Sequence, residues 1–158
     1  MKKYLGVKLI EAEKMSLGTY NNFRGWSIPP NENPKSSGYL VRYTDGYVSW
    51  SPKKQFEEAY RTINNLTFGL AIEAVKKGSK IARKGWNGKN MFVVYQKGYP
   101  DGISSNKQTA EAWGINEGDL FIVRPYLQLK TADGSHAMWS PSTSDCLAED
   151  WKIVEEEK

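Results

Sequence analysis

The alternation of hydrophobic and polar residues in the first part of the chain predicts one strand, one hairpin and one helix. Partial alternation favours a strand over residues 5–13. Residues 16–37 are rich in Gly, Asn, Ser and Pro and predict a long irregular segment, and its three aromatic residues, Tyr20, Phe23 and Trp26, indicate that it packs against the protein. Residues 38–50 alternate around Asp45-Gly46 and predict a β-hairpin. Ser51 and Pro52 are suited to cap and begin a helix that ends near residue 60.

The rest of the chain predicts more strands than helices. A short linker over 61–66 leads to a helix over 68–77, which has helical spacing of apolar residues, Thr67 as its N-cap and Gly78 after its end. Residues 98–105 predict a loop, and Ser105 is suited to cap a helix that ends at Trp113. The segments predicted to be strands are 80–83, 91–96, 120–130 (with Pro125 marking an edge or a bulge), 137–139 and 151–154.

These elements predict an α+β protein with two parts. The first part, residues 1–61, is a small hairpin–helix unit. The second part, residues 66–158, is a compact antiparallel sheet with short helices. With 158 residues, the chain has the length of one ordinary domain or two small ones.

Charge is distributed unevenly between the two parts. Residues 1–61 carry the whole net charge of +4, whereas the charges of residues 66–158 balance. Within the balanced part, residues 76–89 hold six basic residues, and no acidic residue lies between Glu73 and Asp101. A dedicated duplex-DNA binder is more one-sided in charge than this. The distribution therefore favours a local anion site over a nucleic-acid surface.

Composition argues against several classes of protein. One cysteine and one histidine leave neither a disulfide framework nor a multi-histidine metal site, and we expect no cofactor. We expect Cys146 to be a small core residue and His136 to lie at the surface. No segment is apolar enough to cross a membrane, and the N-terminus does not resemble a secretory signal, so we expect a reducing cytosol. No catalytic motif is present, and we expect no enzymatic activity.

The basic block contains the clearest candidate site, a turn in which a tryptophan and an asparagine lie between glycines and cations. An indole ring can stack on a base, an amide can contact a polar edge, and cations attract a phosphate. A tryptophan at this position also suits simple packing in the core. The candidate residues here are Arg83, Lys84, Trp86, Asn87 and Lys89.

A second candidate site follows Trp139, where hydroxyl residues and a carboxylate begin a short helix. Such a helix start presents free N–H groups to phosphate or ribose oxygens. Ordinary N-capping, with Ser142 as the cap and Asp145 completing a capping box, explains the same residues. The candidate residues here are Trp139, Ser142, Thr143 and Asp145.

Several of these pieces occur in one order in a known family, and residues 66–158 resemble the phage Thoeris anti-defence 2 family. The segments that carry the resemblance are 68–74, 82–89, 124–126, 130–134, Trp139 and 145–151. The chain departs from the shorter members in a longer insert at 97–119. It also has Tyr126 where shorter members usually have a histidine.

The resemblance implies a sponge that binds and sequesters a cyclic nucleotide immune signal without cleaving it. That signal is a cyclic ADP-ribose isomer made by bacterial TIR-domain proteins, and some members also hold cyclic dinucleotides. It further implies a homotetramer in the host cytoplasm, with pockets between subunits. By this carry-over, Trp86 stacks on the adenine or the sugar, Asn87 makes polar contacts, and the basic residues of the turn lie near the pyrophosphate. Tyr126 joins the residues of the second candidate site in completing the pocket.

Two other functions remain open from the residues alone. The aromatic surface suits a protein-interaction module whose basic loop is a solvated rim. Trp86 and its neighbouring cations also suit weak binding of single-stranded nucleic acid. The sequence indicates neither which cyclic nucleotide is preferred nor what residues 1–61 do.

Overall fold

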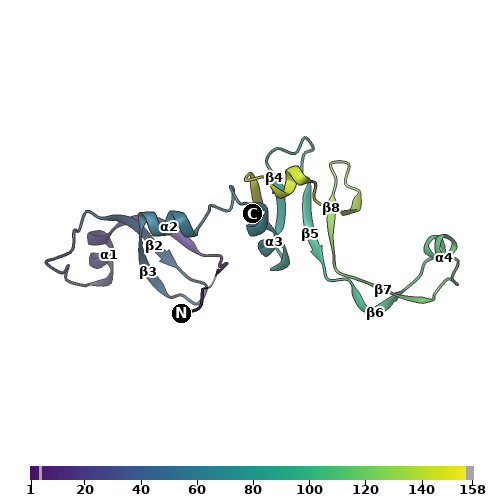
Figure 1. Ribbon diagram of the computed structural model, residues 1–158, viewed down its shortest axis with the longest axis horizontal. Helices are drawn as coiled ribbons and strands as arrows, with labels where there is room; N and C mark the ends of the chain where they lie inside the picture. The colour runs from purple at the N-terminus through teal and green to yellow at the C-terminus, as the bar shows by residue number, and fades with distance from the viewer. Residues whose placement is uncertain (4, 156–158) are drawn as a thin grey trace. The chain divides into compact units, whose positions relative to one another are not determined.

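The computed structural model describes residues 1–3 and 5–155, and the chain separates into two compact units, Met1–Thr62 and Ile63–Lys158 (Figure 1). Across the described residues the chain forms ten strands and five helices, and the paired strands are antiparallel. The predicted α+β class is therefore confirmed. No helix in this described part is both long and apolar enough to cross a membrane.

The first unit is a three-stranded sheet in the order β1-β2-β3 with two helices. Its elements are β1 (Glu11–Ser16), α1 (Leu17–Arg24), β2 (Ser37–Arg42), β3 (Val48–Pro52) and α2 (Lys53–Ala59). The predicted hairpin is confirmed. Its turn forms because Asp45 Oδ1 accepts the N–H of Tyr47 at 2.9 Å and Gly46 adopts a φ of +83°.

Three predictions for this unit were wrong in detail. The strand predicted over 5–13 begins only at Glu11 and continues to Ser16, because β2 pairs with that stretch. Residues 17–24 form a helix rather than an irregular segment, because the Ser16 side chain accepts the Thr19 N–H at one end and Gly25 is left-handed at the other. Helix α2 begins after Pro52, because the last residues of β3 still pair with β2.

The aromatic residues of this segment pack down only in part. Tyr20 is buried, whereas Phe23 and Trp26 remain 58% and 52% exposed. Their rings still contact Tyr20, with centroids 6.4 and 6.0 Å from its centroid.

The second unit is built on a five-stranded sheet in the order β10-β4-β5-β8-β9. The elements of this sheet and its helices are α3 (Phe68–Lys76), β4 (Lys80–Arg83), β5 (Phe92–Gln96), β8 (Tyr126–Lys130), β9 (His136–Trp139), α5 (Thr143–Cys146) and β10 (Trp151–Val154). Apart from β8, which is only the second half of a longer predicted strand, these elements agree with the predicted ones within a few residues. The Thr67 cap of α3 and the Ser142–Asp145 capping box of α5 are confirmed as well.

The two faces of this sheet differ in what they carry. On one face, α3 packs its buried residues Ala71 and Val75 against the sheet core of Ile81, Val93 and Trp151. Because side chains alternate along a strand, the neighbours of those core positions point to the other face. Register places Lys152 beside Ala82 and Phe92 beside Lys130 on that opposite face.

The insert at 97–119, in which the chain departs from the shorter family members, forms a two-stranded ribbon with a helix together with residues 120–123. The ribbon pairs β6 (Tyr99–Ser104) with β7 (Leu120–Val123), and α4 (Lys107–Trp113) lies between them in sequence. The loop predicted over 98–105 was therefore wrong. The single strand predicted over 120–130 is divided into β7 and β8, because Pro125 offers no N–H to continue a ladder.

Two further predictions were wrong at the level of single residues. Asn106 rather than Ser105 caps α4, because its side chain accepts the N–H of Thr109 while the Ser105 hydroxyl donates to the carbonyl of Asn116. Cys146 is exposed rather than part of the core, because Asp145 is the buried residue of the short helix α5. His136 is exposed, as predicted.

Candidate functional site

The turn that joins β4 to β5 is held by contacts at its beginning and its middle. At the beginning, Gly85 donates its backbone N–H to Asp150 Oδ2 at 2.8 Å. In the middle, Gly88 lies so close to the turn of residues 131–135, which joins β8 to β9, that a Cβ there would approach the Cβ of Ala132 to 2.9 Å. A side chain at position 88 would therefore force Ala132 and the Met91 side chain to shift. The turn between Lys84 and Met91, called the cavity turn below, therefore has a defined place at the ends of β4 and β5.

Trp86 extends from this turn into the core. Its ring meets those of Trp139 and Trp151 edge-on, with centroid separations of 6.0 and 5.5 Å. Its Nε1–H donates to Asp145 Oδ1 at 3.4 Å. The indole is only partly buried, and it also lines the cavity described below. Core packing and ligand contact, the two roles open at Trp86, are thus compatible in this geometry.

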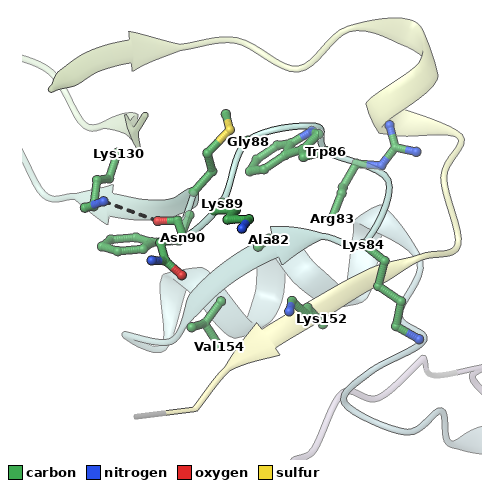
Figure 2. A pocket seen from close by; sticks show the side chains of 12 residues that line it. Ala82, Arg83, Lys84, Trp86, Gly88, Lys89, Asn90, Lys130, Lys152 and Val154 are labelled. Carbon is green, nitrogen blue, oxygen red and sulfur yellow. Dashed lines mark hydrogen bonds between the residues drawn. The ribbon is translucent and has the colours of Figure 1, made fainter. Parts of the chain in front are cut away.

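Arg83 lies at the end of β4, where two carboxylates balance its charge. Its Nε donates to Asp150 Oδ1 at 2.8 Å, and its NH1 donates to Asp145 Oδ1 at 3.0 Å. The hydrogen bond to Asp150, followed by that to Asp145, raises the pKa of the guanidinium. Figure 2 shows this guanidinium pointing away from the Lys84 ammonium group. Arg83 therefore contributes less to an anion site than its formal charge suggests.

Asp145 connects α5 to the turn. One of its carboxylate oxygens accepts both the N–H and the hydroxyl of Ser142, at 3.0 and 2.7 Å. Burial raises the pKa of this carboxyl group, but hydrogen bonds from Ser142, Arg83 and Trp86 outweigh the burial and lower the pKa to about 2. Its backbone carbonyl accepts the indole N–H of Trp151 at 2.9 Å. The residue is ionised at neutral pH and its oxygens already have partners.

A cavity of about 580 Å³ lies between the turn and the sheet (Figure 2). It opens on the face of the sheet opposite α3, and its walls come from β4, the turn, the start of β5, the end of β8 and β10. The lining residues are Ala82, Arg83, Lys84, Trp86, Gly88, Lys89, Asn90, Met91, Phe92, Lys130, Lys152 and Val154.

The cavity has a positive lining with an aromatic floor. Five of the lining residues are basic and none is acidic. Among the described residues, none of Lys89, Lys130 and Lys152 forms an ion pair. The centroid of the Phe92 ring is 5.4 Å from the ammonium nitrogen of Lys80 and 5.8 Å from that of Lys130. Gathered cations repel one another, so an anion in this cavity relieves that repulsion.

The residues predicted for the site fall into three places. Arg83, Lys84, Trp86 and Lys89 line the cavity, whereas Asn87 is exposed on the turn outside the lining. Tyr126 shares the sheet face of Lys130 but begins the strand that Lys130 ends, roughly 13 Å away. The residues of the second candidate site, Trp139, Ser142, Thr143 and Asp145, lie outside the lining. They belong to the core side and to α5, and Trp86 links them to the cavity.

Sequence reasoning missed the basic and aromatic residues that the sheet itself contributes. Phe92, Lys130 and Lys152 come from three different strands, and all three face away from α3. A period-two signal existed at Lys152, which lies between the apolar residues Trp151 and Ile153. The signal did not indicate which strands are neighbours, so the three residues could not be placed together.

The chemistry of the lining suits an anionic, partly aromatic ligand. Lysine ammonium groups bind phosphate as point charges, and aromatic faces stack on bases. In the part of the chain that the structure describes, no group of three or more His, Cys, Asp or Glu side chains is arranged to hold a metal ion.

Comparison with known proteins assigns the part of the chain that holds the cavity to a family. The family model described as "Thoeris anti-defense 2-like domain" matches residues 66–154, more than half of the chain. The chain belongs to this family. A relative named "Thoeris anti-defense 2", from Bacillus phage SP01, is 39% identical over 93 residues, which cover 56% of this chain and 94% of the relative. Membership of the family supports a role in phage anti-defence.

The match to the anti-defence family covers the whole cavity but not the first unit. All twelve lining residues lie between Ala82 and Val154, within the matched range. Residues 1–62 lie outside it. The resemblance of the second part of the chain to this family is thus confirmed.

Proposed function

We propose that this protein binds and sequesters a cyclic nucleotide immune signal without cleaving it. The observation that carries the proposal is the cavity of about 580 Å³ with five basic residues, two aromatic rings and no acidic residue in its lining. Its size falls within the range of small-molecule sites. The name of the phage relative indicates that the Thoeris system is the defence concerned. The preferred candidate ligand is a cyclic ADP-ribose isomer, and cyclic dinucleotides are the next.

Phosphate recognition by the lysines supplies most of the binding free energy in this proposal. An effective sponge needs a dissociation constant below micromolar, or more than about 8 kcal/mol. Stacking on one aromatic ring contributes only about 1–3 kcal/mol. The remainder comes from Lys89, Lys130 and Lys152 around the pyrophosphate, because Arg83 is already paired to two carboxylates and the Lys84 ammonium donates to Asn65 Oδ1 at 2.7 Å.

Trp86 stacks on the base or packs over the sugar in this proposal. Its ring is fixed by Trp139, Trp151 and Asp145, so little conformational entropy is lost when a base arrives. Asn87, exposed beside it, makes polar contacts to the base edge. Trp139, Ser142, Thr143 and Asp145 support the turn from the core side, and Tyr126 reaches the ligand only if the ligand extends along β8.

The assembly that we propose is a homo-oligomer, a tetramer, in the host cytoplasm. The open side of the cavity lies on a sheet face that carries partly exposed apolar residues such as Phe92 and Val154. A second copy over this face would enclose the ligand and exclude water from the phosphate contacts. Light scattering coupled to gel filtration tests this part. A tetramer supports it, and a monomer with and without nucleotide contradicts it.

The site is tested by adding wild-type or variant protein to an excess of nucleotide and measuring how much nucleotide each one removes from solution. We expect wild-type protein to deplete the cyclic ADP-ribose isomer, Trp86→Ala to bind it about 10- to 100-fold more weakly and so to deplete far less, and Trp86→Phe, which keeps an aromatic core contact, to deplete an intermediate amount. Trp113→Ala is the matched control, because Trp113 is 62% exposed on α4 in the insert. Equal depletion by Trp86→Ala and Trp113→Ala would contradict the placement of the base on Trp86.

A further inference from the structure

The segment just before β10 makes three contacts with the start of the cavity turn, all through one residue. Asp150 Oδ1 accepts Arg83 Nε at 2.8 Å and Asp150 Oδ2 accepts the Gly85 N–H at 2.8 Å. Its backbone carbonyl also accepts the N–H of Lys84 at 3.2 Å. Asp150 itself does not line the cavity. One carboxylate thus fixes the chain direction where β4 ends and the turn begins.

We propose that Asp150 is a positioning residue for the nucleotide site. By holding Arg83 and Gly85 together, it sets the path of the turn and hence the place of Trp86 over the cavity. This inference rests on the proposed function for its effect on binding, but the effect on the turn is independent of any ligand.

The glycine at position 85 is part of the same device. A Cβ at Gly85 would lie 3.0 Å from Asp150 Oδ2, tighter than an ordinary contact. Alanine there would push the carboxylate away from the backbone N–H that it accepts. Gly85→Ala and Asp150→Asn therefore disturb one contact from its two sides.

Asp150→Asn changes the binding affinity in opposite directions depending on how Asp150 acts, through its charge alone or by positioning the turn. If Asp150 acts only through its charge, removing a carboxylate close to a cationic cavity tightens the binding of every anion. If Asp150 positions the turn, a nucleotide that needs the Trp86 ring binds more weakly. Inorganic pyrophosphate needs only the lysines, so its affinity stays equal or rises.

The experiment measures the turn and the two affinities in the full chain. Exchange of the Trp86 indole N–H with water is followed by nuclear magnetic resonance without ligand, and the resonance is identified by its loss in Trp86→Phe. Affinities for pyrophosphate and the cyclic ADP-ribose isomer are measured by titration calorimetry. Asp119→Asn is the control, because it removes an equal charge and a carboxylate that also accepts a backbone N–H, that of Asn116.

For Asp150→Asn and Gly85→Ala we expect indole exchange about tenfold faster and nucleotide affinity about tenfold lower, the usual scale for a lost hydrogen bond to a charged group. Pyrophosphate affinity does not fall, and Asp119→Asn matches the wild type. Unchanged indole exchange, or tighter binding of both probes, overturns the inference.

Should Asp150→Asn fail to fold, the same measurements on Gly85→Ala decide whether the inference holds. Should wild-type protein not bind nucleotide, the proposed function fails, and indole exchange still decides whether Asp150 positions the turn.

Discussion

Asp145 Oδ1 accepts a hydrogen bond from Trp86 Nε1 at 3.4 Å, although 59 residues separate them in the chain. The same oxygen accepts Arg83 NH1 at 3.0 Å, and the other oxygen accepts the hydroxyl and N–H of Ser142. The cap of α5 and the cavity turn are thus one connected structure. Asp145 acts within the protein rather than as a free acceptor for a ligand.

Replacing Asp145 by alanine should strongly destabilise the protein. The change leaves the partly buried Arg83 with one carboxylate fewer, leaves the Trp86 indole N–H without its acceptor and removes the capping box of α5. Because Arg83 keeps its ion pair with Asp150, the cost comes from the lost charge-assisted hydrogen bonds and the lost helix cap, about 3 kcal/mol in total. Urea unfolding measures the loss. Asp119→Ala, which removes a single loop hydrogen bond, should cost about 1 kcal/mol; equal losses for the two variants would contradict this role.

Acid should reduce the stability that Asp145 provides. Its folded-state pKa is lowered from 3.8 to about 2, so the native state binds this proton less readily than the unfolded chain. The contribution is therefore complete above about pH 4 and is lost as the pH falls toward 2. We expect the stability gap between wild type and Asp145→Asn to narrow by about 1.5 kcal/mol between pH 5 and pH 2.5. Urea unfolding at both pH values measures the gap, and a constant gap would count against the lowered pKa.

The lysines that the sheet contributes should govern the salt dependence of nucleotide binding. Lys130 and Lys152 line the cavity without an ion pair among the described residues. We expect Lys130→Gln and Lys152→Gln each to weaken binding several-fold at low ionic strength and to flatten its dependence on salt, because exposed charges are screened beyond about 10 Å at 0.1 M. Titrations at 50 and 300 mM salt measure both effects.

Lys107→Gln is the matched control for the lysine variants. Lys107 begins α4 in the insert and does not line the cavity. Its replacement removes the same charge from the same unit. If it weakens binding as much as Lys130→Gln does, net charge rather than the cavity attracts the ligand.

Much of the fold could be predicted from the sequence because its local signals are strong. Thr67 and Ser142 have the right side chains at the right distance to cap helices, and Asp45-Gly46 specifies its turn without help from the rest of the fold. The errors have a different origin. Whether residues 99–104 form a strand depends on β7 as a partner, and the start of β1 depends on β2. Pairing between distant segments is not encoded locally.

The site could be predicted only where its residues adjoin in sequence. Trp86 and its basic neighbours come from one turn and were found, and the same turn lines the cavity. Lys130 and Lys152 reach that cavity through the strand order β10-β4-β5-β8, which no motif reveals. Asp150 would have looked like one of several acidic residues before a strand. Its role follows from its distances to Arg83 and Gly85.

Recovery of the ligand after capture tests the central claim most directly. Purified wild-type protein is mixed with the cyclic ADP-ribose isomer at equal site concentration, free nucleotide is removed by ultrafiltration, and the protein is then denatured by heat. Chromatography and mass spectrometry identify what is released. We predict that the isomer disappears from the filtrate and returns intact and in full on denaturation. A cleaved product would contradict sequestration, and an undepleted filtrate would contradict binding.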